Sequence, residues 1–326
     1  ILITPPEGFK DWVPNGGTRL GSPGDKLNFR GQVRKIKGTP PDNRDVAVNV
    51  ELTSSRIPGR CMNWPRNGGD EPDLKILRTG TTDKLKIEPL DLADKQQALH
   101  QAHGKFKVGD EFTVAVGCYD YGCFGDISFG GSLPVRIEGF DGKTHLALPI
   151  DENENRVADA WERSEGVYDK NLLADWDDVA VAGQRHNGDG ICLYERCRGF
   201  RKDTGEFGRL KCDKKYLFLY DPSNLIRSHG ADADFKSASK LELWFIKADQ
   251  WTGKGSQRDG KRVVNFNHEP PDRAAGPRHR VDQHGLDLVL DPRRQGQGRD
   301  VPIPPGLQRA YVAAGMTPPP PDRTGP

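Results

Sequence analysis

The sequence is poor in hydrophobic residues and has no long apolar run. No run of about 18 apolar residues is present, so no segment has the length and apolarity that a membrane-spanning helix needs. Hydrophobic residues make up only 34% of the 326 positions, and a single large core is therefore excluded. We expect several modest modules, with many of the 38 glycines and 25 prolines in the loops between strands.

Charge of one sign and the common catalytic motifs are missing too. A formal net charge of +1 gives no general attraction to nucleic acid or to an anionic membrane. No HExxH, GxSxG, P-loop or GxGxxG motif stands where its chemistry would need it. The absence of CxxC and CxxCH removes support for zinc ribbons, thioredoxin-like sites and c-type haem. These absences favour a binding or structural protein over an enzyme.

The strongest positive signal is DENENRVADAWE, residues 151–162, where oxygen-bearing side chains recur at regular intervals. An EF-hand calcium loop takes side-chain oxygens from positions 1, 3 and 5, a carbonyl from 7, often a water through 9, and a bidentate glutamate at 12. The residues at these positions are Asp151, Asn153, Asn155, Val157, Asp159 and Glu162. We predict a Ca²⁺ site in this first loop, followed by a helix that begins near Ala158.

Two features of the first loop depart from the usual EF-hand pattern. Position 6 is normally glycine because its backbone needs a positive φ, and here it is Arg156, for which a left-handed conformation costs about 1 kcal/mol or more. Asn153 and Asn155 replace the usual aspartates, which lowers the negative charge and predicts weak affinity. The alternative is an acidic surface loop that caps a helix.

A second acidic stretch, which we call the second loop, runs into NGDGICLYERCRGF at 187–200. Gly190 follows Asp189 as a turn glycine should, but counting from Asp189 as position 5 places Glu195 one residue early. The predicted ligand set is therefore irregular, and a solvated acidic loop is the alternative. Its members are Asp175, Asp177, Asp178, Asn187, Asp189, Ile191 and Glu195.

Taken together, RVADAWE, the Asp-rich stretch and GDGICLYERCRGF resemble the EF-hand-like and thrombospondin type 3-like calcium repeats of secreted and surface-attached bacterial proteins. The resemblance covers residues 151–200 and no more. It implies that calcium rigidifies a module, and it implies neither an enzyme nor a particular partner. With the polar composition, it favours an extracellular or cell-surface location.

The rest of the chain predicts a mainly β protein. Short, partly alternating apolar segments separated by Gly- and Pro-rich turns indicate an immunoglobulin-like sandwich at 26–150, interrupted by one short helix at 91–104. Its predicted strands are 26–36, 45–52, 73–78, 84–89, 110–119, 132–140 and 143–150. The other predicted parts are an extended N-terminal arm at 1–25, the calcium-binding segment at 151–200, a β-rich or α+β module at 201–292 and an extended Pro-rich tail at 293–326.

Within the 201–292 module, four segments have the pattern of strands and one has that of a loop or short helix. The loop or short helix is 223–239. The predicted strands are 214–221, 240–249, 261–269 and 284–291.

Six cysteines allow three disulfides with no thiol left over. We favour Cys197 with Cys212, because a turn-rich segment separates them. The CYDYGC loop can close on itself, which leaves Cys61 and Cys192 as the third pair. Buried free cysteines are the alternative. The two cysteines of CYDYGC are Cys118 and Cys123, which form one predicted pair.

These observations favour a secreted, calcium-stabilised structural or adhesive surface protein. We expect it to self-assemble, as a filament or surface layer, by contacts of the 1–25 and 293–326 segments with other copies. One alternative is a secreted hydrolase that uses paired carboxylates, such as Glu162 with Asp178 or Glu195, or a histidine cluster. That cluster is His268, Glu269, His279 and His284 with Asp282 nearby. The other alternative is a carbohydrate-binding module that contacts glycans through Trp176.

Overall fold

A computed structural model of the chain describes most of its first three quarters. The described residues are 1–17, 22–35, 43–55, 72–78, 84–92, 97–174, 176, 189, 191–221, 224–228, 230–246 and 286–287. The chain divides into two compact units, of which the first is Ile1–Asn171 among the described residues and the second starts at Leu172. The division falls inside the predicted 151–200 segment, so the first loop belongs to the first unit and the second loop to the second.

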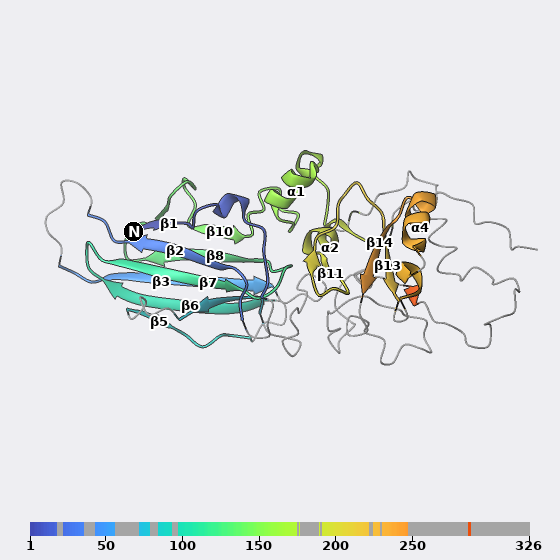
Figure 1. The fold of residues 1–326 in the computed structure, drawn as a ribbon. Coiled ribbons are helices and arrows are strands. Elements are labelled where there is room, and N and C mark those ends of the chain that lie inside the picture. The colour runs from blue at the N-terminus through green and yellow to red at the C-terminus, as the bar shows by residue number, and fades with distance from the viewer. Residues whose placement is uncertain are drawn as a thin grey trace, which may run out of the picture. The chain divides into compact units, whose positions relative to one another are not determined.

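The described residues of the first unit form two five-stranded sheets (Figure 1). One sheet has the order β4-β7-β2-β1-β9 and the other β10-β8-β3-β6-β5. All neighbours are antiparallel except β1 and β9, which are parallel. Their bounds are β1 Leu2–Thr4, β2 Lys26–Gln32, β3 Val46–Ser55, β4 Leu74–Leu77, β5 Leu85–Ile87, β6 Gln97–Phe106, β7 Glu111–Cys118, β8 Gly125–Gly131, β9 Arg136–Ile137 and β10 His145–Leu148.

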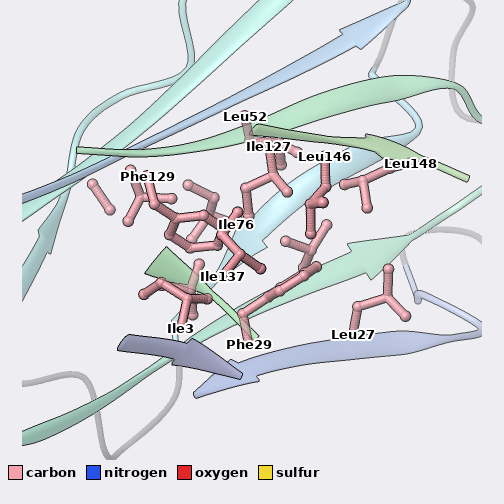
Figure 2. Close-up of a cluster of buried hydrophobic side chains, with 14 of the residues drawn as sticks. Ile3, Leu27, Phe29, Leu52, Ile76, Ile127, Phe129, Ile137, Leu146 and Leu148 are labelled. Carbon is pink, nitrogen blue, oxygen red and sulfur yellow. The ribbon is translucent and has the colours of Figure 1, made fainter. Parts of the chain in front are cut away.

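The two sheets share one hydrophobic core, which lies between them (Figure 2). Alternate residues of each strand supply it, as the burial of every second position along β2 and β3 shows. Phe29 of β2 meets Phe129 of β8 across the core, with ring centroids 5.6 Å apart. Ile76 and Ile127 are buried in the same cluster. This face-to-face packing makes the first unit a rigid support for the loop that follows β10.

The segment predicted as an extended arm, 1–25, begins with a strand of the first unit at Leu2–Thr4. Leu2–Thr4 pairs with β2 on one side and with β9 on the other. Ile3 is completely buried and belongs to the core between the sheets. The Ile1 amino group donates to the carbonyl of Pro134 at 2.8 Å. The beginning of this segment is therefore part of the sheet, with Ile3 packed in the core.

The predicted helix at 91–104 is wrong, because most of it belongs to the ten-residue strand β6. Ala98, Ala102 and Phe106 are buried at even spacing along β6, and its whole length pairs with β3. Helix propensities favour Ala, Leu and Gln by only a few tenths of a kcal/mol per residue, and burial against a long neighbouring strand outweighs them. Gly104, expected to end the helix, instead lies where a Cβ atom would come 2.4 Å from the carbonyl oxygen of Lys84.

Strand β8 was not predicted, because its sequence GDISFGG is rich in glycine. The structure gives the reason for two of these glycines. A Cβ atom on Gly125 would lie 2.0 Å from the carbonyl oxygen of Thr53, and one on Gly131 would lie 2.3 Å from that of Ala47. Strand β8 therefore approaches β3 so closely that side chains are excluded at both ends, while Ile127 and Phe129 between them fill the core.

The second unit contains a small parallel sheet with the order β14-β13-β15. Parallel neighbours need a crossover connection, and here helices α3 and α4 lie between β13 and β14 in the chain. Phe218 and Trp244 are buried in one cluster, and Leu219 and Phe245 in another. The bounds are α2 Leu193–Arg198, β11 Phe200–Arg201, β12 Phe207–Gly208, β13 Tyr216–Tyr220, α3 Leu225–Ser228, α4 Ala231–Ser239, β14 Glu242–Ile246 and β15 Leu286–Asp287.

The mainly β character of the protein is confirmed. The predicted strand at 261–269, the histidine cluster at 268–284 and the Pro-rich tail at 293–326 lie outside the described residues. Within the described ranges, no helix combines the length and the apolar character needed to cross a membrane.

Candidate calcium site in the first loop

The first loop connects β10 to helix α1, which spans Asp159–Glu165. The predicted helix start near Ala158 is confirmed. The amide of Asp159 donates to the carbonyl of Ile150 at 3.0 Å, which closes the loop at its base. Trp161 is buried in α1, and α1 also contacts the short helix η1, Phe9–Asp11. Both ends of the loop are therefore fixed to the first unit.

Burial alternates from Asp151 to Val157, as expected for a loop whose alternate residues face a bound cation. Asp151 and Asn153 are half-buried, and Asn155, Val157 and Asp159 are buried. Of the side chains between them, Glu152, Glu154 and Arg156 are exposed, whereas Ala158 is buried. Positions 1, 3, 5, 7 and 9 of the EF-hand pattern thus lie inside the loop.

Arg156, at position 6, has the left-handed backbone that this position of an EF-hand loop requires. Its φ is +65°, and Glu154 is left-handed as well with a φ of +59°. The turn points the amides of Asn155 and Arg156 back at Asp151, whose Oδ1 and Oδ2 accept them at 3.0 and 2.8 Å. The positive φ expected at position 6 is therefore confirmed for Arg156. For a non-glycine residue this conformation costs about 1 kcal/mol or more.

Glu162, at position 12, returns from the first turn of α1 to meet the loop. Its Oε1 accepts a hydrogen bond from Nδ2 of Asn155 at 2.8 Å, and its Oε2 accepts one from Nδ2 of Asn153 at 3.2 Å. Glu162 is completely buried. The structure thus brings positions 3, 5 and 12 together, as the sequence spacing predicts.

Three carboxylates are crowded in this small space, and their pKa values show it. Burial raises the pKa of Glu162 to about 7, the two Asn amides oppose the rise, and the charges of Asp159 and Asp151 add to it. Burial also raises the pKa values of Asp151 and Asp159. The loop therefore holds negative charge that its own hydrogen bonds compensate only in part.

Asp159 carries the clearest sign of incomplete compensation. Its Oδ2 accepts the amide of Glu152 at 3.0 Å and Nη2 of Arg163 at 3.3 Å. Its Oδ1 is buried and has no hydrogen-bond partner among the described residues. A buried oxygen without a donor is rare, because it loses water without replacement. It is the kind of atom that a bound cation or an ordered water would satisfy.

The set of donor atoms fits a hard cation. Carboxylate, amide and backbone oxygens suit calcium, whereas zinc and other soft metals prefer the imidazole and thiolate ligands that the loop does not contain. The described part of the chain holds no ready cage of three or more His, Cys, Asp or Glu side chains. In the first loop, the Nδ2 groups of Asn153 and Asn155 donate hydrogen bonds to both carboxylate oxygens of Glu162. Calcium binding would therefore require both amides to turn their oxygens inward.

Arg163 and Tyr168 are neighbours of the site that sequence reasoning missed. Nη2 of Arg163 lies 3.3 Å from both Glu152 Oε2 and Asp159 Oδ2, and its guanidinium stacks 4.4 Å from the ring centroid of Tyr168. The spacing of Asp159 and Arg163, four apart at a helix start, is a signal that points to this ion pair. The exposed Arg163 partly neutralises Asp159 from outside the loop.

In the second loop, the carboxylate of Asp189 is already fully engaged. Its Oδ1 accepts Nη2 of Arg196 at 2.8 Å and the amide of Ile191 at 3.0 Å, and its Oδ2 accepts the amide of Tyr216 at 2.9 Å. Burial raises the pKa of Asp189, and the Arg196 charge opposes this. Glu195 accepts the amide of Cys192 at 2.9 Å as part of a helix cap.

Four predicted members of the second ligand set lie outside the described residues, and they are Asp175, Asp177, Asp178 and Asn187. Of the described members, Ile191 is buried, with its carbonyl accepting Nε of Arg196 at 3.1 Å. A calcium ion at Asp189 would have to displace the Arg196 guanidinium. Calcium binding in the second loop therefore stays a prediction, and Arg196 would compete with the ion for the Asp189 carboxylate.

The described residues do not assemble either alternative site, the hydrolase site or the glycan-binding site at Trp176. Trp176 is half-buried, and its carbonyl accepts the amide of Leu193 at 2.8 Å, so its backbone is part of the second unit's framework. The candidate histidines at 268–284 and Asp178 are not described. Comparison of the chain with protein-family models, with curated proteins and with solved structures gave no match. The first loop is thus the candidate site with the most complete geometry.

Proposed function

We propose that residues 151–162 bind one calcium ion and that the ion locks helix α1 onto the sandwich of the first unit. The observation that carries this proposal is the buried Asp159 Oδ1, which has no hydrogen-bond partner among the described residues and belongs to the same loop as the crowded Glu162 and Asp151. When bound, calcium supplies two positive charges and accepts about six to eight oxygen ligands.

The chain's own residues prepare the loop for this role. Asp151 holds the turn by accepting two backbone amides, and Arg156 adopts the conformation that turns the chain back. Glu162 links the loop to α1, because it lies on the helix and contacts the two Asn side chains of the loop. Any ion that attracts both Asp151 and Glu162 would therefore resist separation of α1 from β10. This is a structural clamp rather than a switch.

For the whole protein, we propose a secreted or surface-attached structural or adhesive role. The polar composition, rich in Gly and Pro, and the first unit's two packed sheets, of proposed immunoglobulin-like character, support it. The calcium site proposed for the first loop would be weak and suited to millimolar extracellular calcium. Self-assembly through residues 293–326 remains part of the proposal, whereas Leu2–Thr4 is committed to its own sheet.

Calcium titration of the metal-free full chain tests the site. We expect calcium to raise the melting temperature, with a gain of about 2.7 kcal/mol when calcium reaches roughly 100 times its Kd. Glu162→Gln and Asp159→Asn should each remove most of the gain. Glu154→Gln is the matched control, because Glu154 is an exposed carboxylate of the same loop.

Terbium luminescence, sensitised by the nearby Trp161, gives an independent measurement of binding in the same variants. Unchanged calcium binding by Glu162→Gln would refute the first-loop site. A gain that survives in Glu162→Gln and disappears in Asp189→Asn would move the calcium to the second loop.

The assembly proposal is tested separately by sedimentation of the full chain and of residues 1–292 in calcium. Equal assembly of the two would exclude the 293–326 arm.

A further inference from the structure

Two buried cysteines face each other where the chain crosses from one sheet of the first unit to the other. Cys118 is the last residue of β7, and Cys123 lies two residues before β8 begins at Gly125. Both are described as free thiols, with side chains almost completely excluded from solvent. Their Sγ atoms are 3.2 Å apart. This pair of thiols plays no part in the proposed calcium site.

The backbone around the pair holds the two sulfurs in place. The amide of Cys118 donates to the carbonyl of Asp25 at 3.0 Å, and its carbonyl accepts the amide of Gly24 at 2.9 Å. Within the loop, the amide of Gly122 donates to Asp120 Oδ1 at 2.7 Å, and Sγ of Cys118 lies 3.1 Å from the carbonyl oxygen of Asp120. A disulfide has an S–S distance of about 2.05 Å. The sulfurs therefore need to approach by only about 1.1 Å.

We propose that Cys118 and Cys123 form a disulfide that closes the β7–β8 connection when the chain folds in the presence of a small-molecule disulfide oxidant. One thiolate attacks the oxidant, which releases one thiolate and leaves a mixed disulfide. The second cysteine thiolate then attacks its neighbour's sulfur and releases the other oxidant thiolate. The chain loses two electrons and two protons, one S–S bond forms, and the oxidant's S–S bond becomes two thiols.

The buried surroundings of the pair would make this disulfide, which we call the staple, resistant to reduction. Burial raises the pKa of the Cys123 thiol, and the neighbouring Cys118, Asp73 and Asp120 raise it further. Little thiolate is therefore present once the loop is folded, so the exchange belongs to folding, when the sulfurs are still accessible. After closure, the same burial keeps reductants away from the bond.

The staple ties together a junction of several strands. The amide of Tyr119 donates to the carbonyl of Asp73, next to β4, at 2.7 Å, and the amide of Ser55, at the end of β3, donates to the carbonyl of Phe124 at 2.7 Å. Closing a loop between residues 118 and 123 restricts the unfolded chain, and so it stabilises the folded state. We therefore expect the disulfide to raise the stability of the first unit.

Peptide mapping of the full chain tests the pairing. The protein is refolded in a buffer of oxidised and reduced glutathione, denatured, treated with an alkylating reagent and digested with trypsin. We expect one peptide to contain both Cys118 and Cys123, unalkylated and lighter by two hydrogens than its reduced form. Alkylation of both cysteines, or linkage of either one to Cys61, would overturn the proposal. This measurement on the wild-type chain needs no variant to fold.

Thermal melting tests the staple's effect. Wild-type chain that is unfolded and refolded in reductant should melt roughly 4 °C or more below the oxidised chain. The double variant Cys118→Ser/Cys123→Ser should melt at the same temperature with and without reductant. If reduction destabilises that variant as much as the wild type, the stabilising bond lies elsewhere and the proposal fails.

Discussion

The two acidic loops look alike in the sequence but differ in how the folded chain handles their charge. In the first loop, the buried Glu162 meets only amide donors, and Asp159 keeps one buried oxygen without a partner among the described residues. In the second loop, Asp189 forms a buried ion pair with Arg196 at 2.8 Å and accepts two backbone amides. The cation that pairs with Asp189 is thus buried inside the chain, whereas Arg163 reaches Asp159 only from the exposed side of the first loop.

This difference teaches that the spacing of acidic residues does not by itself define a calcium site. A buried arginine can take the place of the metal, because its planar guanidinium satisfies carboxylate and carbonyl oxygens together. Arg196 does this by donating also to the carbonyls of Lys211 and Lys214, at 2.9 and 2.8 Å. The comparison predicts that the loops respond differently to mutation, pH and calcium.

The largest expected effect follows from removing the internal cation of the second loop. Arg196→Met should destabilise the second unit by about 3 to 5 kcal/mol, because it leaves the Asp189 charge buried without its partner. Adding Asp189→Asn should restore part of this loss. Urea unfolding of the single and double variants measures both values. A loss under 1 kcal/mol for Arg196→Met would show that the ion pair does not hold the second loop together.

A second effect concerns pH and the first loop in metal-free protein. The folded-state pKa of Glu162, about 7, is above its ordinary value of 4.5, so the protonated form favours folding. This contribution is present below pH 4.5 and is lost as pH rises through 7, a loss of about 3 kcal/mol for the shift of Glu162 alone. Glu162→Gln should remove that dependence.

Urea unfolding of the metal-free wild type, Glu162→Gln and Glu154→Gln across this pH range measures the difference. The wild type and Glu162→Gln share every other carboxylate, and Glu154→Gln controls for the loss of one exposed carboxylate from the loop, so the comparison isolates Glu162. Calcium should flatten the wild-type curve as well. A wild-type curve parallel to that of Glu162→Gln would mean that Glu162 is not the crowded group that the structure describes.

The smallest effect comes from the strained turn of the first loop. Arg156→Gly should change stability by about 1 kcal/mol or less, because relief of the left-handed conformation is partly offset by the greater freedom of glycine in the unfolded chain. It should also tighten calcium binding, since the turn is then formed without strain. Asn171→Gly is the matched control, because Asn171 is also left-handed, with a φ of +49°, but lies outside the loop.

Calorimetric titration with calcium measures this last difference. Tighter binding in Arg156→Gly and unchanged binding in Asn171→Gly would confirm that the turn at position 6 limits affinity. Equal effects of the two substitutions would assign the change to general backbone relief.

Much of the first loop could be predicted because its contacts are local. Asp151 and Glu162 are eleven positions apart, and the alternation between them already states which side chains share a face. The left-handed Arg156 could be predicted for the same reason. The fate of Asp189 could not, because Tyr216, one of its hydrogen-bond partners, is 27 positions away. The pairing of Asp189 with Arg196 depends on burial, which the local pattern does not state.

The same division explains the fold. Apolar alternation alone predicted most strands of the first unit and the mainly β character, and the calcium-loop pattern predicted the start of helix α1. Only the tertiary structure decided that 97–106 is a strand, that Leu2–Thr4 joins the sheet and that the glycines of β8 belong in one. In each case pairing with a distant strand outweighs a local preference of tenths of a kcal/mol per residue. Local spacing thus predicted the geometry of the first loop, and packing decided that Asp189 is paired with the buried Arg196.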